Sequence, residues 1–175
     1  IHIVTPGGHP AIQIYQSRIE LSDSVISRRD IRRLTIRQSE LKVPDGRRIT
    51  QSHRLQYLTE GQSHIQNPNG MRATQLAADI AILSHNSLSV DNLSEAIVQN
   101  HLQVGHIHHS AAVAGLSCLN EEERDLGAIV LDMGGGTTAI SAYLDNRIIY
   151  ANTIALGGQH ITRDIARVLS LSINA

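Results

Sequence analysis

Apolar and polar residues alternate along much of the first half of the chain, which is the pattern of strands half-buried in a sheet. A short apolar run at 1–5 predicts a first strand, and looser alternation at 11–21 predicts a strand or hairpin. Residues 48–59 are rich in Ile, Thr, Leu and Tyr and predict another strand. A strong turn signal at 67–70 precedes a further predicted strand at 71–84.

Helical spacing of apolar residues interrupts these strands. Ser27 is a candidate N-cap, because Asp30 three residues later can complement the free N–H groups of a first turn. This helix is expected to run to about Leu41. A second helix is predicted at 89–102 and a third, rich in small residues, at 110–119. The apolar face of the second helix is expected to hold Val90, Leu93, Ala96 and Ile97.

The last third of the chain has a different order of elements. A short strand is predicted at 106–109, and 128–131 is typical of a buried strand. Two more strands are predicted at 139–144 and 147–154, separated from their neighbours by short turns. A pair of glycines then precedes a helix for which Thr162 is the candidate N-cap. The whole pattern predicts an α/β protein.

Composition narrows the function classes. Hydrophobic residues make up 41% and charged residues 18%, as in a globular chain. The net charge of −1 and an aromatic content of 2% argue against a nucleic-acid partner, although 28–37 contains five arginines. That basic run is interpreted as a solvated or partner-facing side of a helix. The single cysteine, Cys118, fits a reducing cytoplasm, and no apolar stretch is long enough to span a bilayer.

The turn between the predicted strands at 128–131 and 139–144 carries the candidate chemistry. A phosphate needs backbone N–H groups that it can approach closely, and Gly134, Gly135 and Gly136 leave the backbone bare. Thr137 and Thr138 add hydroxyl donors. Asp132 ends the preceding strand, where its carboxylate can hold Mg²⁺ through water beside a phosphate.

Other glycine-rich motifs fit this turn less well. A Walker A loop requires Lys followed by Ser or Thr and then a helix, and neither is present. A dinucleotide-binding fingerprint also passes into a helix, whereas 139–144 predicts a strand. Spacing alone leaves open a glycine-rich hairpin that binds no ligand.

Histidines gather in one part of the sequence, at His101, His106, His108 and His109. His106 and His108 share one face of a predicted strand and form a plausible pair for zinc. No Cys, Asp or Glu lies close in sequence to complete such a site, so ordinary surface or partly buried imidazoles are the favoured interpretation.

Residues 130–138, Val-Leu-Asp-Met-Gly-Gly-Gly-Thr-Thr, resemble the second phosphate-binding loop of the actin, Hsp70 and sugar-kinase superfamily. Members of that superfamily close two RNase H-like halves over ATP. Three further stretches are similar to the bacterial FtsA cell-division family, and they occur in its order. They are Ile26-Ser27-Arg28-Arg29-Asp30-Ile31, Ile65-Gln66-Asn67-Pro68-Asn69-Gly70-Met71 and Leu119-Asn120-Glu121-Glu122-Glu123-Arg124-Asp125-Leu126-Gly127.

This resemblance implies an actin-like ATPase (RNase H-like) fold fragment with an inserted small α+β subdomain, called 1C in FtsA. Residues 1–84 would be mostly 1C-like, 85–126 the remainder of subdomain 1A, and 127–175 the start of 2A with the second phosphate-binding hairpin. The chain begins at Ile1 without an initiator methionine and stops at Ala175 inside an apparent helix. An internal segment of a longer protein is therefore expected.

The resemblance also implies a function. An FtsA protein would bind ATP and Mg through Asp132, Gly134, Gly135, Gly136, Thr137 and Thr138, with Asp132 reaching Mg through water. It would polymerise into filaments and tether FtsZ, with other divisome proteins, to the inner face of the cell membrane at the division site. The membrane contact would come from a C-terminal helix that is not in this sequence.

Catalysis is expected to be weak. No residue is assigned a catalytic role, any ATPase activity is expected to be slow, and this segment alone is expected to be inactive. Family members often carry a polar residue where Ala139 stands, which weakens any catalytic inference. The alternative is a sugar- or acetate-kinase-like phosphotransferase of the same superfamily. An Hsp70-like chaperone fits less well, because of the inserted unit.

Overall fold

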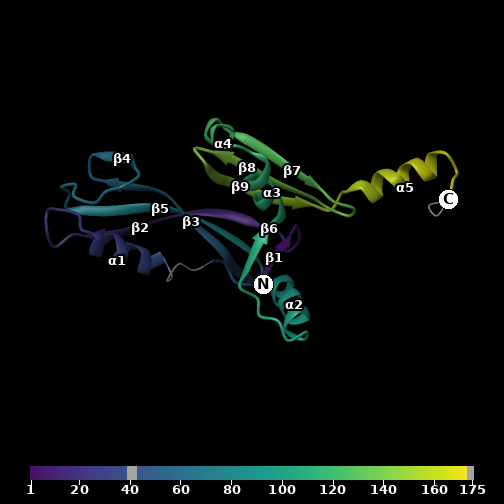
Figure 1. Ribbon diagram of the computed structural model, residues 1–175, viewed down its shortest axis with the longest axis horizontal. Coiled ribbons are helices and arrows are strands. Elements are labelled where there is room, and N and C mark those ends of the chain that lie inside the picture. The colour runs from purple at the N-terminus through teal and green to yellow at the C-terminus, as the bar shows by residue number, and fades with distance from the viewer. Residues whose placement is uncertain (39–42, 173–175) are drawn as a thin grey trace.

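The computed structural model describes residues 1–38 and 43–172, in which strands and helices alternate much as the hydrophobic pattern predicts (Figure 1). The elements are β1 (His2–Thr5), β2 (Ala11–Glu20), α1 (Arg28–Gln38), β3 (Arg47–Thr59), β4 (Gln62–Ile65), β5 (Gln75–Asn86), α2 (Ser87–Val98), β6 (His106–His109), α3 (Ser110–Cys118), α4 (Glu121–Leu126), β7 (Ala128–Met133), β8 (Thr138–Leu144), β9 (Arg147–Ile154) and α5 (Gly158–Val168). The predicted α/β class is confirmed.

The largest sheet is antiparallel, with the strand order β2-β5-β3-β4. The inner strand β5 is buried along nearly its whole length. Leu76 of β5 and Leu34 of α1 are fully buried in the core that this sheet forms with α1. Strand β4 was not predicted, because Gln62-Ser63-His64-Ile65 has no apolar alternation.

Helix α1 begins where the sequence predicts. The Ser27 N–H donates to Asp30 Oδ2 at 3.0 Å, and the Asp30 N–H donates to Ser27 Oγ at 3.3 Å. These reciprocal bonds satisfy free N–H groups of the first turn. The described part of the helix runs to Gln38, and the predicted end at Leu41 lies outside the described residues.

A short parallel pair, β1 beside β6, packs against α2. Ile3, Val90 and Ile107 are buried between them, with Leu93 and Ile97 partly buried. The prediction that Ala96 shares this face is wrong, because the buried stripe of α2 is narrow and leaves that residue exposed. The helix also starts earlier than predicted, since the Asn86 side chain caps it by accepting from the Ser89 N–H at 3.1 Å.

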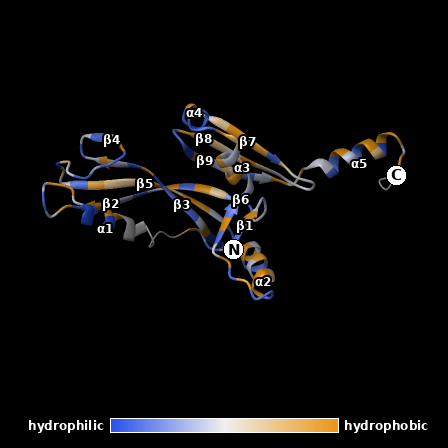
Figure 2. Ribbon diagram, viewed as in Figure 1, coloured by the Kyte–Doolittle hydropathy of each residue, from blue (hydrophilic) through white to orange (hydrophobic). Residues whose placement is uncertain are grey.

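The third sheet, β7-β8-β9, is antiparallel and carries α3 on one face. The Ser141 hydroxyl donates to the Ala111 carbonyl of α3 at 3.0 Å. The opposite face of β7 is open, with Ile129 72% and Leu131 58% exposed. Figure 2 shows the hydrophobic colouring along this strand. The prediction of a buried strand at 128–131 is therefore wrong for alternate residues, because nothing in the described part of the chain covers that face. Helix α5 projects away from the sheets (Figure 1).

Two buried histidines mark the place where the sheets meet. His85 is the penultimate residue of β5, and its Nδ1 lies 2.8 Å from the hydroxyl of Thr50 in β3. The His109 ring ends β6, 6.2 Å from the His85 ring, and its Nε2 lies 3.2 Å from the Ile140 carbonyl of β8. Burial is the main cause that lowers the pKa of His85, to about 4, with smaller contributions from the charges of His109 and Arg47.

This buried imidazole predicts a loss of stability in mild acid. Unfolding returns the His85 pKa from about 4 to its ordinary 6.5, so between these values the unfolded chain binds more protons. The free energy of unfolding should therefore fall as the pH drops from about 6.5 to about 4, by up to about 3 kcal/mol from this group. Urea denaturation at several pH values measures it, and His85→Gln should flatten the profile. An unchanged slope in that variant would contradict the assignment.

Candidate functional site

The predicted phosphate loop is a tight connection between β7 and β8. Met133 and Thr138 are paired at the end of the ladder, and the Gly134 N–H donates to the Thr137 carbonyl at 2.9 Å. Asp132 is the penultimate residue of β7 and is half-buried. The structure thus brings the predicted residues together at one end of the hairpin.

Three consecutive backbone donors of this loop have no partner. Within the described part of the chain, the N–H groups of Gly135, Gly136 and Thr137 make no hydrogen bond. Gly136 also has open space around it, since a Cβ atom built there would meet nothing within 4 Å. Exposed N–H groups in succession form an anion-binding concavity. The residues present therefore fit a phosphate group.

The start of α5 holds the loop in place. The Gly158 N–H donates to the Gly134 carbonyl at 2.9 Å, and the Gln159 N–H donates to the Gly135 carbonyl at 2.8 Å. The contact is close enough to demand glycine at 157, where a Cβ atom would lie 2.4 Å from the Gly134 carbonyl oxygen. The carbonyls thereby point to α5.

Thr138 has a structural contact in this arrangement. Its side chain is buried, and its hydroxyl donates to the Leu156 carbonyl at 2.7 Å. A hydroxyl that gives its hydrogen to Leu156 has none left for a phosphate. The Thr137 side chain is half-buried beside the unpartnered N–H groups.

Sequence reasoning missed the role of Gly157 and misplaced the start of α5. The predicted N-cap, Thr162, lies inside the helix, where its hydroxyl donates to the Gly158 carbonyl at 3.1 Å. Gly157 is the N-cap, and its N–H donates to His160 Nδ1 at 3.1 Å. The Gly-Gly pair was the available signal, because a close backbone approach is one of the reasons for a glycine.

The histidines of β6 have a neighbour that the sequence did not suggest. His2 Nδ1 lies 3.1 Å from His108 Nε2, across the β1–β6 pair. His109 lies apart from them in the buried junction, and His101 is exposed in the turn after α2. In the described residues, no group of three or more His, Cys, Asp or Glu is arranged to hold a metal ion as it stands.

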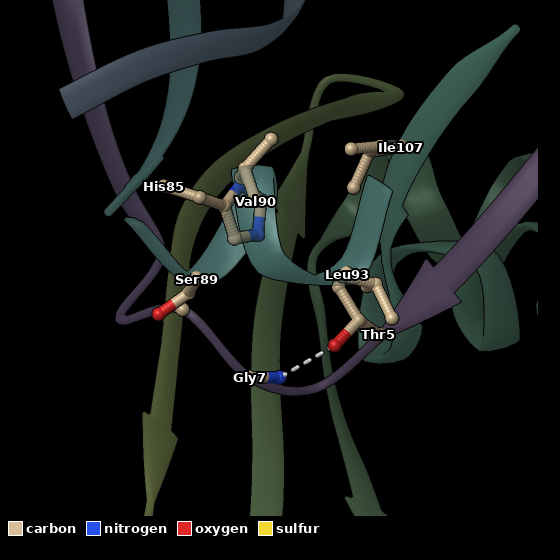
Figure 3. Close-up of a pocket in the computed structure, with 8 residues that line it drawn as sticks. Thr5, Gly7, His85, Ser89, Val90, Leu93 and Ile107 are labelled. Atoms are coloured by element: carbon tan, nitrogen blue, oxygen red, sulfur yellow. Dashed lines mark hydrogen bonds between the residues drawn. The ribbon is translucent and has the colours of Figure 1, made fainter. Parts of the chain in front are cut away.

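A separate cavity of about 310 Å³ lies between β1, α2 and the end of β5 (Figure 3). Its lining is mainly apolar, with Val90, Leu93 and Ile107, and the buried His85 adds a polar group. At its rim the Gly7 N–H donates to Thr5 Oγ1 at 3.0 Å. None of the predicted cofactor-binding residues lines it.

Comparison with known proteins agrees with this architecture. The family model "Cell division protein FtsA" matches residues 129–175, and the model "SHS2 domain inserted in FTSA" matches residues 7–84. The FtsA of Agrobacterium fabrum is 32% identical over 166 residues, which are 95% of this chain and 38% of that protein. The FtsA of Neisseria meningitidis serogroup B is 28% identical over 176 residues, which are 99% of this chain and 42% of that protein.

Among solved structures, the PilM-PilN type IV pilus biogenesis complex aligns with a TM-score of 0.50 over 93% of this chain and 45% of that one, at 19% identity. Fold, hairpin and insert together define a protein of the actin-like ATPase fold that carries an inserted SHS2 domain. Within that class, the chain belongs to the FtsA family. It spans about two fifths of the length of the relatives named above. No helix among the described residues is long and apolar enough to cross a membrane.

The contact between Gly157 and the loop predicts opposite results for two alanine substitutions. Gly157→Ala should destabilise the fold by about 1–3 kcal/mol, because its Cβ would collide with backbone oxygen. Gly136→Ala should change stability by less than about 0.5 kcal/mol, because that position is open. Urea denaturation compares the two, and hydrogen exchange of the α5 amides should rise in Gly157→Ala alone. Equal stability of the two variants would contradict the packing described.

Proposed function

We propose that the Gly134–Thr137 loop binds the phosphates of ATP. The observation that carries this proposal is the set of unpartnered N–H groups at Gly135, Gly136 and Thr137. Their donors are free while the Gly134 and Gly135 carbonyls are already bonded to α5, so the open side of the loop presents hydrogen-bond donors. Such an array suits an anion and is unsuited to a cation.

Asp132 is proposed to hold Mg²⁺ through water. When bound, Mg²⁺ would neutralise negative charge on the phosphates of ATP. The carboxylate is half-buried, one residue before the end of β7. Of the residues assigned from the sequence, Thr138 is proposed to support the loop through Leu156. No residue is assigned a catalytic role.

At the level of the whole protein, we propose the cell-division role that the relatives' name states. The protein would polymerise, tether FtsZ and other divisome proteins to the cytoplasmic face of the membrane, and act at the division site. Residues 1–84 are proposed to be the 1C-like unit, 85–126 the remainder of 1A, and 127–175 the start of 2A. Membership of the FtsA family supports this assignment.

Nucleotide binding predicts a local response in this chain. Addition of Mg-ATP at millimolar concentration should shift the amide resonances of Gly135, Gly136 and Thr137 before those of other residues. Millimolar ligand is needed because one loop supplies only part of a nucleotide site. Gly136→Ala should weaken the response about tenfold or more, since a methyl group keeps phosphate from the backbone and a hydrogen bond to a charged group is worth about 1.5–3 kcal/mol.

Asp132→Asn should leave ATP binding without Mg²⁺ intact and remove most of the gain that Mg²⁺ gives. Asp145→Asn is the matched control, because Asp145 is exposed in the β8–β9 turn and has φ of +50°, which asparagine tolerates. Shifts spread evenly over the chain, or an equal loss in Asp145→Asn, would refute the assigned site.

The cell-division role predicts that this chain can replace the matching segment of a relative. A chimera of the Agrobacterium fabrum FtsA carrying this chain should restore septum formation in cells depleted of their own FtsA. Gly136→Ala in the chimera should reduce that rescue if nucleotide binding is required, and Asp145→Asn should not. Microscopy of division sites measures the result, and a stable chimera that never reaches the septum would contradict the role.

A further inference from the structure

We propose that His2, His106 and His108 form a binding site for Zn²⁺ or a similar transition metal that prefers imidazole. The three residues share one face of the β1–β6 pair, because His2 is in register with His106 and side chains two apart in a strand point the same way. Two imidazoles from one strand and one from its neighbour match the three-histidine ligand sets of open zinc sites.

The distances between the rings suit a metal. His2 Nδ1 and His108 Nε2 are 3.1 Å apart and form a hydrogen bond, which a metal ion bound by both rings would replace. Two nitrogens bound tetrahedrally to zinc, at bond lengths of about 2.0–2.1 Å, lie about 3.3–3.4 Å apart. The His106 ring is centred 5.1 Å from that of His2 and 6.0 Å from that of His108. His106 is exposed, so its ring can turn to bring a nitrogen to the same point.

Gln51 of β3 provides the supporting contact that metal-bound histidines need. Its Nε2 lies 2.6 Å from His108 Nδ1, while its Oε1 is buried without a partner among the described residues. Rotating the amide by half a turn places Oε1 at Nδ1, where it accepts a hydrogen bond from the ring N–H. His108 then keeps its hydrogen on Nδ1 and offers the Nε2 lone pair to the metal, which is how an outer partner fixes a ligand's tautomer.

The surroundings of His108 favour its neutral form. Desolvation, followed by the charges of His2, His106 and His53, lowers the pKa of His108. A neutral imidazole is the form that ligates metals. An ion held here would connect β1 to β6 and, through Gln51, to the four-stranded sheet, so binding should stabilise the folded state.

Isothermal titration of the tag-free 175-residue chain with Zn²⁺ tests the proposal. One equivalent is expected to bind, and Co²⁺ in its place should show the intense visible absorption of a tetrahedral site. His2→Asn, His106→Asn and His108→Asn should each weaken binding about tenfold or more, and Gln51→Ala about tenfold. The thermal midpoint of the wild type should rise with Zn²⁺, and that of the triple variant should not.

His101→Asn is the matched control. His101 is an exposed histidine in the same part of the chain, and its φ of +59° suits asparagine. It should bind Zn²⁺ like the wild type. Circular dichroism without metal establishes that each variant is folded. Binding that survives in the folded triple variant, that falls equally in His101→Asn, or that is absent from the wild type would overturn the proposal.

Discussion

The arrangement of the chain depends on a group of hydrogen bonds at the end of β5, where the chain leaves the four-stranded sheet. The Arg47 side chain donates from Nε to Ser84 Oγ at 2.8 Å and from Nη2 to the carbonyls of Ser84 and His9, at 2.6 and 2.7 Å. Two residues further along β5, the Asn86 N–H donates to the Gly8 carbonyl at 2.7 Å. These bonds join the start of β3, the end of β5 and the segment that enters β2. Because β1 precedes that segment and α2 follows β5, the same bonds fix how the inserted sheet sits on the β1–β6 pair.

Features with a local physical cause could be predicted from the sequence. The Ser27–Asp30 cap needs two side chains three residues apart, and the hairpin at 134–137 needs glycines between two apolar strands. Both depend on hydrogen bonds between near neighbours, so the residue types alone define them. Strand β4 has no such signal, since it is a polar segment that pairs only because the β3 turn returns it to that edge.

Features that depend on contacts between distant segments could not be predicted from the sequence. The start of α5 is set by carbonyls of the loop more than twenty residues earlier, so Thr162 looked like a better cap than Gly157. The exposure of the side chains along β7 also depends on a distant segment. Apolar residues at alternate positions predict a strand, but which face is covered depends on where α3 packs. The hydrogen bond from the Thr138 hydroxyl to the Leu156 carbonyl also joins segments that are distant in the sequence.

Strand β6 separates the two proposed sites by the simple alternation of a strand. His106 and His108 lie with His2 on one side, whereas His109 reaches the Ile140 carbonyl of β8 on the other. The β7–β8 hairpin, which carries the proposed phosphate loop, contacts β6 through this bond of His109. A substitution at His106 or His108 therefore removes an imidazole from the metal face while the contact between His109 and β8 stays in place. Because side chains two apart in a strand share a face and adjacent ones do not, loss of metal binding and loss of phosphate binding are separable by substitution.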